Sequence, residues 1–100
     1  MVYKVIWSPL AIKTYIENIE HLEVLWTDKE ILIFINSVKR KIHLLTTNPN
    51  LGSPTTRRKN VRKSVIHKRV VLFYRVKSAK KEIELIRFWA TRRNPGNLKF

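Results

Sequence analysis

Hydrophobic and polar residues recur at two different spacings along this 100-residue chain, and each spacing predicts a different kind of element. The segment Val70–Val76 (VVLFYRV) contains no Gly or Pro and is apolar except for Tyr74 and Arg75. A run this short and this apolar is typical of a strand buried on both faces. It predicts the central strand of a sheet, with two further strands beside it at Val61–His67 and Glu82–Trp89.

The strand at Val61–His67 is predicted from its apolar centre, Val65-Ile66, whereas the strand at Glu82–Trp89 shows the alternation expected when successive side chains point to opposite faces. The same spacing predicts a first strand at Val2–Trp7. In the last strand the pattern predicts that Ile83 and Leu85 share one face, whereas Glu84, Ile86 and Phe88 share the other.

After the first strand, apolar residues recur at the spacing of a helix. Ser8 is a favoured N-cap, and Pro9 suits the first helical position because its missing N–H would have no partner there. A helix is therefore predicted over Pro9–Val24. Its apolar stripe, at intervals of three or four residues, consists of Ile12, Tyr15, Ile16, Ile19 and Leu22.

A second helix is predicted from Asp28 to about Thr46. Thr27 and Glu30 have the spacing of a capping box, in which each side chain bonds the backbone N–H of the other residue. Asn48-Pro49 ends the helix, because proline disfavours helical geometry in the residue before it, and residues 48–60 are expected to form a loop. The core stripe consists of Ile31, Phe34, Ile35, Val38, Ile42 and Leu45.

These elements predict a single α+β domain over residues 1–100. Two helices joined by a short turn pack as an antiparallel hairpin, and the apolar stripe on each predicts that both cover the same face of the sheet. The expected fold is a small antiparallel sheet with this hairpin on one face, in the order β-α-α-β-β-β.

The charge is concentrated in the second half of the chain. The net charge is +14, and residues 51–100 carry 15 Lys and Arg against 2 Asp and Glu, whereas residues 1–50 carry 6 against 5. Such an asymmetry indicates an anionic partner. A nucleic acid or an acidic protein is favoured over a membrane surface, because membranes attract basic amphipathic helices and these charges fall on strands and loops.

Several classes of protein are disfavoured by the composition. The chain has no cysteine, which excludes disulfides and thiolate metal sites and favours a reducing compartment. It also lacks the apolar run of a membrane span or a signal peptide, so a cytoplasmic protein is expected. Five of the seven acids lie at positions 17–30, away from the basic half, and no metal or other cofactor is expected.

A cluster of cations is the strongest candidate for chemistry. Arg75 interrupts an apolar strand, so its side chain must point away from the helices or be paired. With Arg92 it could hold a phosphoryl group, and His67 could act as general acid or base in RNA cleavage through the 2′-OH. The remaining candidates for contact with a nucleic acid or other target are Arg57, Arg58, Lys59, Arg62, Lys63, Lys68, Arg69 and Arg93.

The order of these elements resembles the RelE/ParE superfamily of toxins from type II toxin–antitoxin modules, the plasmid stabilisation family. The segments that carry the resemblance are Trp7-Ser8-Pro9 with Ala11, Pro49-Asn50-Leu51-Gly52, Val61-Arg62, Val71–Val76 and Arg92-Arg93-Asn94-Pro95. The resemblance implies a toxin that arrests growth and is neutralised by a cognate antitoxin. It also implies one of two targets, which are DNA gyrase for ParE-like members and ribosome-bound mRNA for the metal-independent RelE-like endoribonucleases.

The residues carried over from the RelE-like pattern are few. Arg92 matches the arginine after the last strand, but the arginine at the start of the central strand falls on Val71. The lysine pair has a counterpart only around Lys63, and the C-terminal tyrosine falls near Leu98. Pro49–Gly52 and the run from Phe73 to Val76 are closer to the ParE-like pattern. The alternative from a different class is a basic nucleic-acid-binding module without toxicity.

Overall fold

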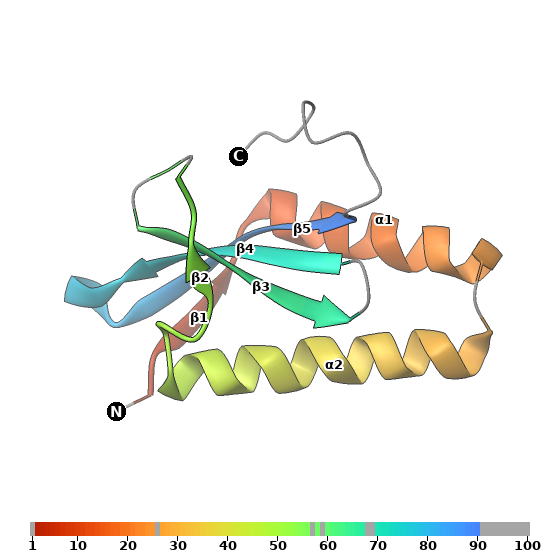
Figure 1. The fold of residues 1–100 in the computed structure, drawn as a ribbon, viewed down its shortest axis with the longest axis horizontal. Helices are drawn as coiled ribbons and strands as arrows, with labels where there is room; N and C mark the ends of the chain where they lie inside the picture. Colours follow the sequence, from red (N-terminus) through yellow and green to blue (C-terminus); the bar gives the residue numbers. More distant parts are fainter. Residues whose placement is uncertain (1, 26, 57, 59, 68–69, 91–100) are drawn as a thin grey trace.

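The computed structural model describes residues 2–25, 27–56, 58, 60–67 and 70–90. In these ranges the chain forms two helices, α1 and α2, which run antiparallel, and a twisted sheet (Figure 1). The element bounds in chain order are β1 (Lys4–Trp7), α1 (Pro9–Leu25), α2 (Asp28–Thr47), β2 (Ser53–Pro54), β3 (Val61–His67), β4 (Val70–Lys77), the 3-10 turn η1 (Ser78–Lys80) and β5 (Glu82–Ala90).

The predicted α+β fold is confirmed, with one change in the sheet. The strand order is β1-β5-β4-β3-β2, which places β4 near the middle, as its apolar run predicts. Neighbouring strands from β2 to β5 pair in antiparallel fashion, but β1 runs parallel to β5, so the sheet is mixed rather than antiparallel. The long stretch of chain between β1 and β5, which includes both helices and three strands, makes this parallel pair possible.

Strand β2 lies inside the segment that the sequence predicts as a loop. It has two residues, and Ser53 and Pro54 pair with Lys63 and Arg62 of β3. Two residues are too few to show any periodicity. Proline in a sheet is confined to positions such as an edge strand, where its missing N–H breaks no ladder.

The core lies between the two helices and one face of the sheet. Its members from α2 are Phe34, Val38 and Leu45, all buried, so the predicted stripe of this helix is confirmed. The capping box is also present, since Thr27 accepts a bond from the N–H of Glu30 and the Glu30 side chain accepts one from Thr27. Buried residues of β3, β4 and β5 complete this core, namely Ile66, Val70, Leu72, Tyr74, Ile83, Leu85 and Phe88.

Helix α1 is rotated from the orientation that its apolar residues predict. Ile12 and Ile16 are 47% and 49% exposed, so their assignment to the core stripe is wrong. Thr14 and Asn18 are buried instead, at 2% and 6% exposure, beside the fully buried Ala11. Burying polar side chains in place of isoleucine is favourable only if those side chains are hydrogen-bonded.

The polar side chains of α1 bond the backbone of β5 at the edge that β1 leaves uncovered. β1 pairs only with residues 82–85 of β5. Beyond them, Ser8 Oγ donates to the carbonyl of Ile86 at 3.0 Å, and Thr14 Oγ1 accepts from the N–H of Phe88 at 2.9 Å. Asn18 Nδ2 donates to the Phe88 carbonyl at 3.4 Å. Helix α1 therefore continues the edge that β1 begins, using side chains in place of a strand backbone.

A β-bulge in β5 places the groups that α1 bonds. The register passes from Phe73↔Arg87 to Tyr74↔Leu85, so Ile86 and Arg87 both lie opposite Phe73. The extra residue reverses the alternation. Phe88 consequently joins Ile83 and Leu85 in the core, and the prediction that it shares a face with Glu84 is wrong. The period-2 alternation used to predict the strand faces cannot reveal that a bulge inserts an extra residue.

On the face of the sheet that the helices cover, Phe88 packs in a group of aromatic rings. The ring of Tyr15 from α1 lies 5.4 Å from Phe88, 5.5 Å from Trp7 and 6.2 Å from Phe34, measured between centroids. These distances fall in the range where aromatic pairs attract one another. The group joins β1, α1, α2 and β5.

Replacing the hydroxyl of Thr14 tests the bond between helix and sheet edge. We expect Thr14→Val, which preserves the side-chain shape, to lower the free energy of unfolding by about 1–3 kcal/mol, because the buried N–H of Phe88 loses its partner. Urea unfolding followed by circular dichroism measures this loss. The matched control is Thr47→Val at the exposed end of α2, with an expected change within about 0.5 kcal/mol. Equal effects of the two substitutions would contradict this role for Thr14.

Candidate functional site

The face of the sheet opposite the two helices carries two of the five predicted site residues that the structure describes, Lys63 and Arg75. We call it the helix-free face, since neither α1 nor α2 packs on it. From the strand alternation and the register, its side chains are Val61, Lys63, Val65, Val71, Phe73, Arg75, Lys77, Glu82, Glu84, Ile86, Arg87 and Trp89. Val61, Phe73, Ile86 and Trp89 form a small apolar cluster, and the guanidinium of Arg87 lies 4.9 Å from the Trp89 ring centroid.

Arg75 lies on the helix-free face, as its place in an apolar strand predicts, and is also paired. It is opposite Glu84 of β5, and its Nη1 is 3.9 Å from Glu84 Oε1. Lys77 Nζ approaches the same carboxylate oxygen at 3.7 Å. The Nε of Arg75 is buried and has no hydrogen-bond partner among the described residues. Glu84 therefore lies between two cations and leaves much of the hydrogen-bonding capacity of Arg75 unused.

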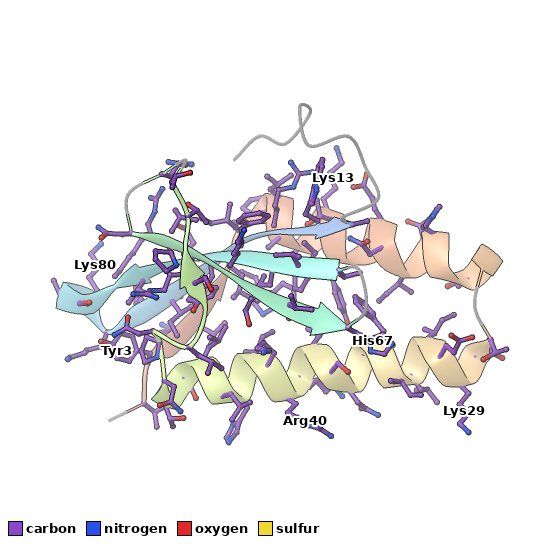
Figure 2. The ribbon with its side chains drawn as sticks, viewed as in Figure 1. Tyr3, Lys13, Lys29, Arg40, His67 and Lys80 are labelled. Carbon is purple, nitrogen blue, oxygen red and sulfur yellow. The ribbon has the colours of Figure 1, made fainter. Side chains whose placement is uncertain are left out.

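Arg75 also lines two pockets. One has a volume of about 260 Å³ and is lined by Ser8, Leu10, Arg58, Arg75, Glu84 and Ile86. The other has a volume of about 510 Å³ and is lined by Asn60, Arg75, Val76, Lys77, Ser78, Ala79 and Lys80. Lys80 is labelled at the end of the sheet that carries η1 (Figure 2).

The structure places His67 and Arg75 at opposite ends of the β3–β4 hairpin. His67 pairs with Val70 at one end, whereas Val61 pairs with Arg75 at the other. The five steps along the backbone from Val70 to Arg75 span roughly 17 Å at about 3.3 Å per step. Figure 2 shows His67 at the end of β3 beside α2.

Arg62 is engaged with the backbone of the segment before β2. Its Nη1 donates to the carbonyl of Gly52 at 2.6 Å and to that of Asn50 at 3.4 Å. Lys63, the next residue of β3, is exposed, and so is Arg58. Arg58, Lys63 and Arg75 can therefore meet a partner, whereas Arg62 already has a structural role.

Tyr74 holds the same segment from inside the core, a role that the sequence did not reveal. Its hydroxyl accepts from the N–H of Gly52 at 2.8 Å and donates to the carbonyl of Pro49 at 2.9 Å. A Cβ on Gly52 would clash with the carbonyl oxygen of Lys63 at 2.5 Å and with this hydroxyl at 2.6 Å. Only glycine fits there, which gives the Pro49–Gly52 motif a structural explanation. In the sequence, the only indication of this role was a tyrosine within an otherwise apolar strand.

The other predicted residues lie outside the described ranges. They are Arg57, Lys59, Lys68, Arg69, Arg92 and Arg93. Among the residues that are described, no three His, Asp or Glu side chains gather closely enough to hold a metal ion. None of the described helices is long and apolar enough to cross a membrane.

Removing the Tyr74 hydroxyl should destabilise the protein and change its response to alkali. We expect Tyr74→Phe to lower the free energy of unfolding by about 1–3 kcal/mol, because the buried N–H of Gly52 loses its acceptor. Burial raises the pKa of Tyr74 above 10.0, although the Gly52 hydrogen bond and the charge of Arg62 act in the opposite direction. As pH rises above 10.0, the unfolded chain loses the Tyr74 proton before the folded chain does, so this contribution to stability falls.

The wild type should therefore lose more stability than Tyr74→Phe when urea unfolding is repeated from pH 9 to pH 11. Tyr3→Phe, which removes the hydroxyl of a half-exposed tyrosine, serves as the control and should follow the wild type. Parallel pH profiles for the wild type and Tyr74→Phe would contradict the assignment.

Comparison with known proteins places this architecture in a family. The family model described as the ParE toxin of the type II toxin–antitoxin system parDE matches residues 5–95. A search of curated protein sequences finds no match. Among solved structures, a chromosomal ParDE toxin–antitoxin system from P. aeruginosa superimposes with a TM-score of 0.70 at 21% identity, covering 87% of this chain and 94% of that one.

A second similar structure is the toxin–antitoxin complex RelBE2 from Mycobacterium tuberculosis. It superimposes with a TM-score of 0.61 at 16% identity and covers 88% of this chain and 96% of that one. At these identities the two structures support the fold, while the family match spans nearly the whole chain. The chain belongs to the ParE family of toxins from type II toxin–antitoxin systems, within the RelE/ParE superfamily.

Proposed function

We propose that this toxin arrests growth by binding DNA gyrase, without cutting mRNA, and that a cognate acidic antitoxin neutralises it. The observation that carries the choice of target is the separation between His67 and Arg75 along the β3–β4 hairpin. Metal-independent cleavage through a 2′-OH needs a base, an acid and phosphate-binding cations within hydrogen-bond reach of one phosphodiester. His67 and Arg75 rise from the backbone at points roughly 17 Å apart along the hairpin, which argues against both acting on one scissile bond.

The surface between these two residues also favours contact with a protein. Val71 occupies the position at which the RelE-like pattern has an arginine, and Phe73 follows on the same face. Across the β4–β5 pair, Trp89 lies opposite Val71. Phe73 and Trp89 are only 5% and 6% exposed and pack against Val71. The apolar surface open to a partner is therefore the half-buried Val71 together with Val65, which is 58% exposed. Apolar surface of this kind is typical of the core of a protein interface.

The antitoxin partner is proposed from charge and from the similar structures. The ParDE system and the RelBE2 complex both pair a toxin with an antitoxin. In this chain, residues 51–100 carry 15 Lys and Arg against 2 Asp and Glu. An acidic partner would be attracted by such a surface over a distance of about one Debye length, which speeds encounter at low salt.

Two assays on the wild type separate gyrase from mRNA as the target. After tightly controlled induction, we expect growth arrest with intact mRNA and loss of supercoiling by purified gyrase incubated with the purified chain. New mRNA 5′ ends within translated codons, with gyrase unaffected, would overturn the proposal.

Substitution of Val65 tests whether the helix-free face makes the contact. Val65 is 58% exposed on this face, and Leu32 is 59% exposed on α2. Introducing a buried, unpaired charge into an interface is costly, so Val65→Glu should weaken gyrase inhibition about tenfold or more, whereas Leu32→Glu should leave it unchanged. Gyrase supercoiling titrations measure both. The reverse ranking would place the contact on the helices.

A further inference from the structure

We propose that the pocket between the start of α1 and the β4–β5 pair binds the carboxylate of an acidic side chain from a protein partner. Arg75 and Arg58 would hold the incoming carboxylate, and Glu84 occupies Arg75 until it arrives. The proposal concerns a binding site only, so it does not depend on whether gyrase is the toxin's target.

The pocket is built by four separate parts of the chain. Ser8 and Leu10 come from the start of α1, Arg58 from the segment before β3, Arg75 from β4, and Glu84 and Ile86 from β5, enclosing about 260 Å³. Ser8 fixes the relative position of two of these parts, because its hydroxyl accepts from the N–H of Ala11 at 3.0 Å and donates to the carbonyl of Ile86 at 3.0 Å. The start of α1 and β5 are therefore held in place relative to each other before any ligand binds.

Arg75 has hydrogen-bonding capacity that its present contacts leave unused. A charge-assisted bond between guanidinium and carboxylate is usually about 2.7–2.9 Å long, and the planar fork favours two such bonds at once. The Nη1 of Arg75 is instead 3.9 Å from Glu84 Oε1, beyond hydrogen-bond length. Its buried Nε has no hydrogen-bond partner among the described residues. The Arg75 side chain as a whole is 29% exposed, so a second carboxylate could reach the Nη donors that Glu84 leaves unpaired.

The charges around the pocket favour an anion even with Glu84 present. Lys77 shares Glu84 with Arg75, at 3.7 Å from the same oxygen, and so offsets part of its negative charge. Arg58 adds an exposed cation to the lining. The N-terminal end of α1 adds a partial positive charge beside Ser8 and Leu10. One internal carboxylate is thus outnumbered by the surrounding positive groups.

The lining fits a carboxylate on a peptide better than a nucleic-acid backbone. Leu10 and Ile86 provide apolar surface beside the arginines, which suits a peptide with an apolar side chain next to its acidic one. A phosphodiester backbone carries a charge at every step and has no apolar side chain to place against Leu10 and Ile86. Arg75 already faces a carboxylate, which is the chemistry that we assign to the ligand.

Nuclear magnetic resonance on the whole ¹⁵N-labelled chain tests the site by observing Arg75 Nε directly. The probe is the peptide acetyl-Leu-Glu-Leu-amide, with acetyl-Leu-Gln-Leu-amide as the neutral control and dimethyl phosphate as the phosphodiester, all at constant ionic strength. We expect the Nε–H resonance of Arg75 to shift saturably with the Glu peptide and to remain in place with the Gln peptide. Equal shifts with both peptides, or tighter binding of dimethyl phosphate than of the Glu peptide, would overturn the proposal.

Three substitutions should change the affinity for the Glu peptide in different and predictable ways. Arg75→Gln should weaken binding of the Glu peptide by about fivefold or more, because the principal donor is lost. Glu84→Gln should strengthen it by roughly fivefold, since the internal competitor is removed. Arg40→Gln removes the same charge from the exposed side of α2, where Figure 2 labels it, and should change affinity by less than about twofold.

The effect of Glu84→Gln separates a binding site from a structural ion pair. If Glu84 only stabilised Arg75 in the fold, its removal would weaken binding or leave it unchanged, and either result would contradict the proposal. Should Arg75→Gln fail to fold, Arg58→Gln takes its place, because Arg58 is exposed and outside the core. Unchanged binding by a folded Arg58→Gln protein would remove Arg58 from the site and contradict the pocket as assigned.

Discussion

The hydrogen bonds from helix α1 to the free edge of β5 are the constraint on which the rest of this structure depends. β1 covers only residues 82–85 of that edge. The backbone beyond it would be buried without partners if Ser8, just before α1, and Thr14 and Asn18 within α1 did not bond it. Satisfying these groups fixes the rotation of α1. The rotation turns Tyr15 into the core and leaves Ile12 and Ile16 at the surface. The two isoleucines are left exposed because a buried backbone group without a hydrogen bond would cost more free energy than their exposure does.

The same edge connects the fold to the candidate site. The bulge that presents the Ile86 carbonyl to Ser8 also reverses the alternation in β5, sending Phe88 to the helices and both Ile86 and Arg87 toward the helix-free face. That face therefore combines an apolar cluster with Arg75 and Lys77 around Glu84. Because Ser8 and Ile86 also line the pocket beside Arg75, the contact that positions α1 also shapes the proposed carboxylate site.

Sequence patterns predicted the features that local physics determines. The capping box at Thr27, the stripe of α2 and the central position of β4 depend on neighbours a few residues away, and all three are confirmed. The bulge joins Phe73 to Arg87, 14 positions away, and the rotation of α1 and the Tyr74–Gly52 contact join residues between 22 and 78 positions apart, which no local pattern encodes. For the site, the outward direction of Arg75 followed from the cost of burying a charge. Its pairing with Glu84 and its separation from His67 required the strand register.

Hydrogen exchange at the amide of Phe88 tests the central claim most directly. This N–H lies beyond the last residue that β1 covers, and its acceptor is the Thr14 hydroxyl rather than a strand carbonyl. If α1 completes the edge of the sheet, the Phe88 amide should exchange as slowly as amides in the middle of β4, because both then open only with the core. Exchange as fast as that of a fraying strand end would contradict the account, since it would mean that this edge is open to water.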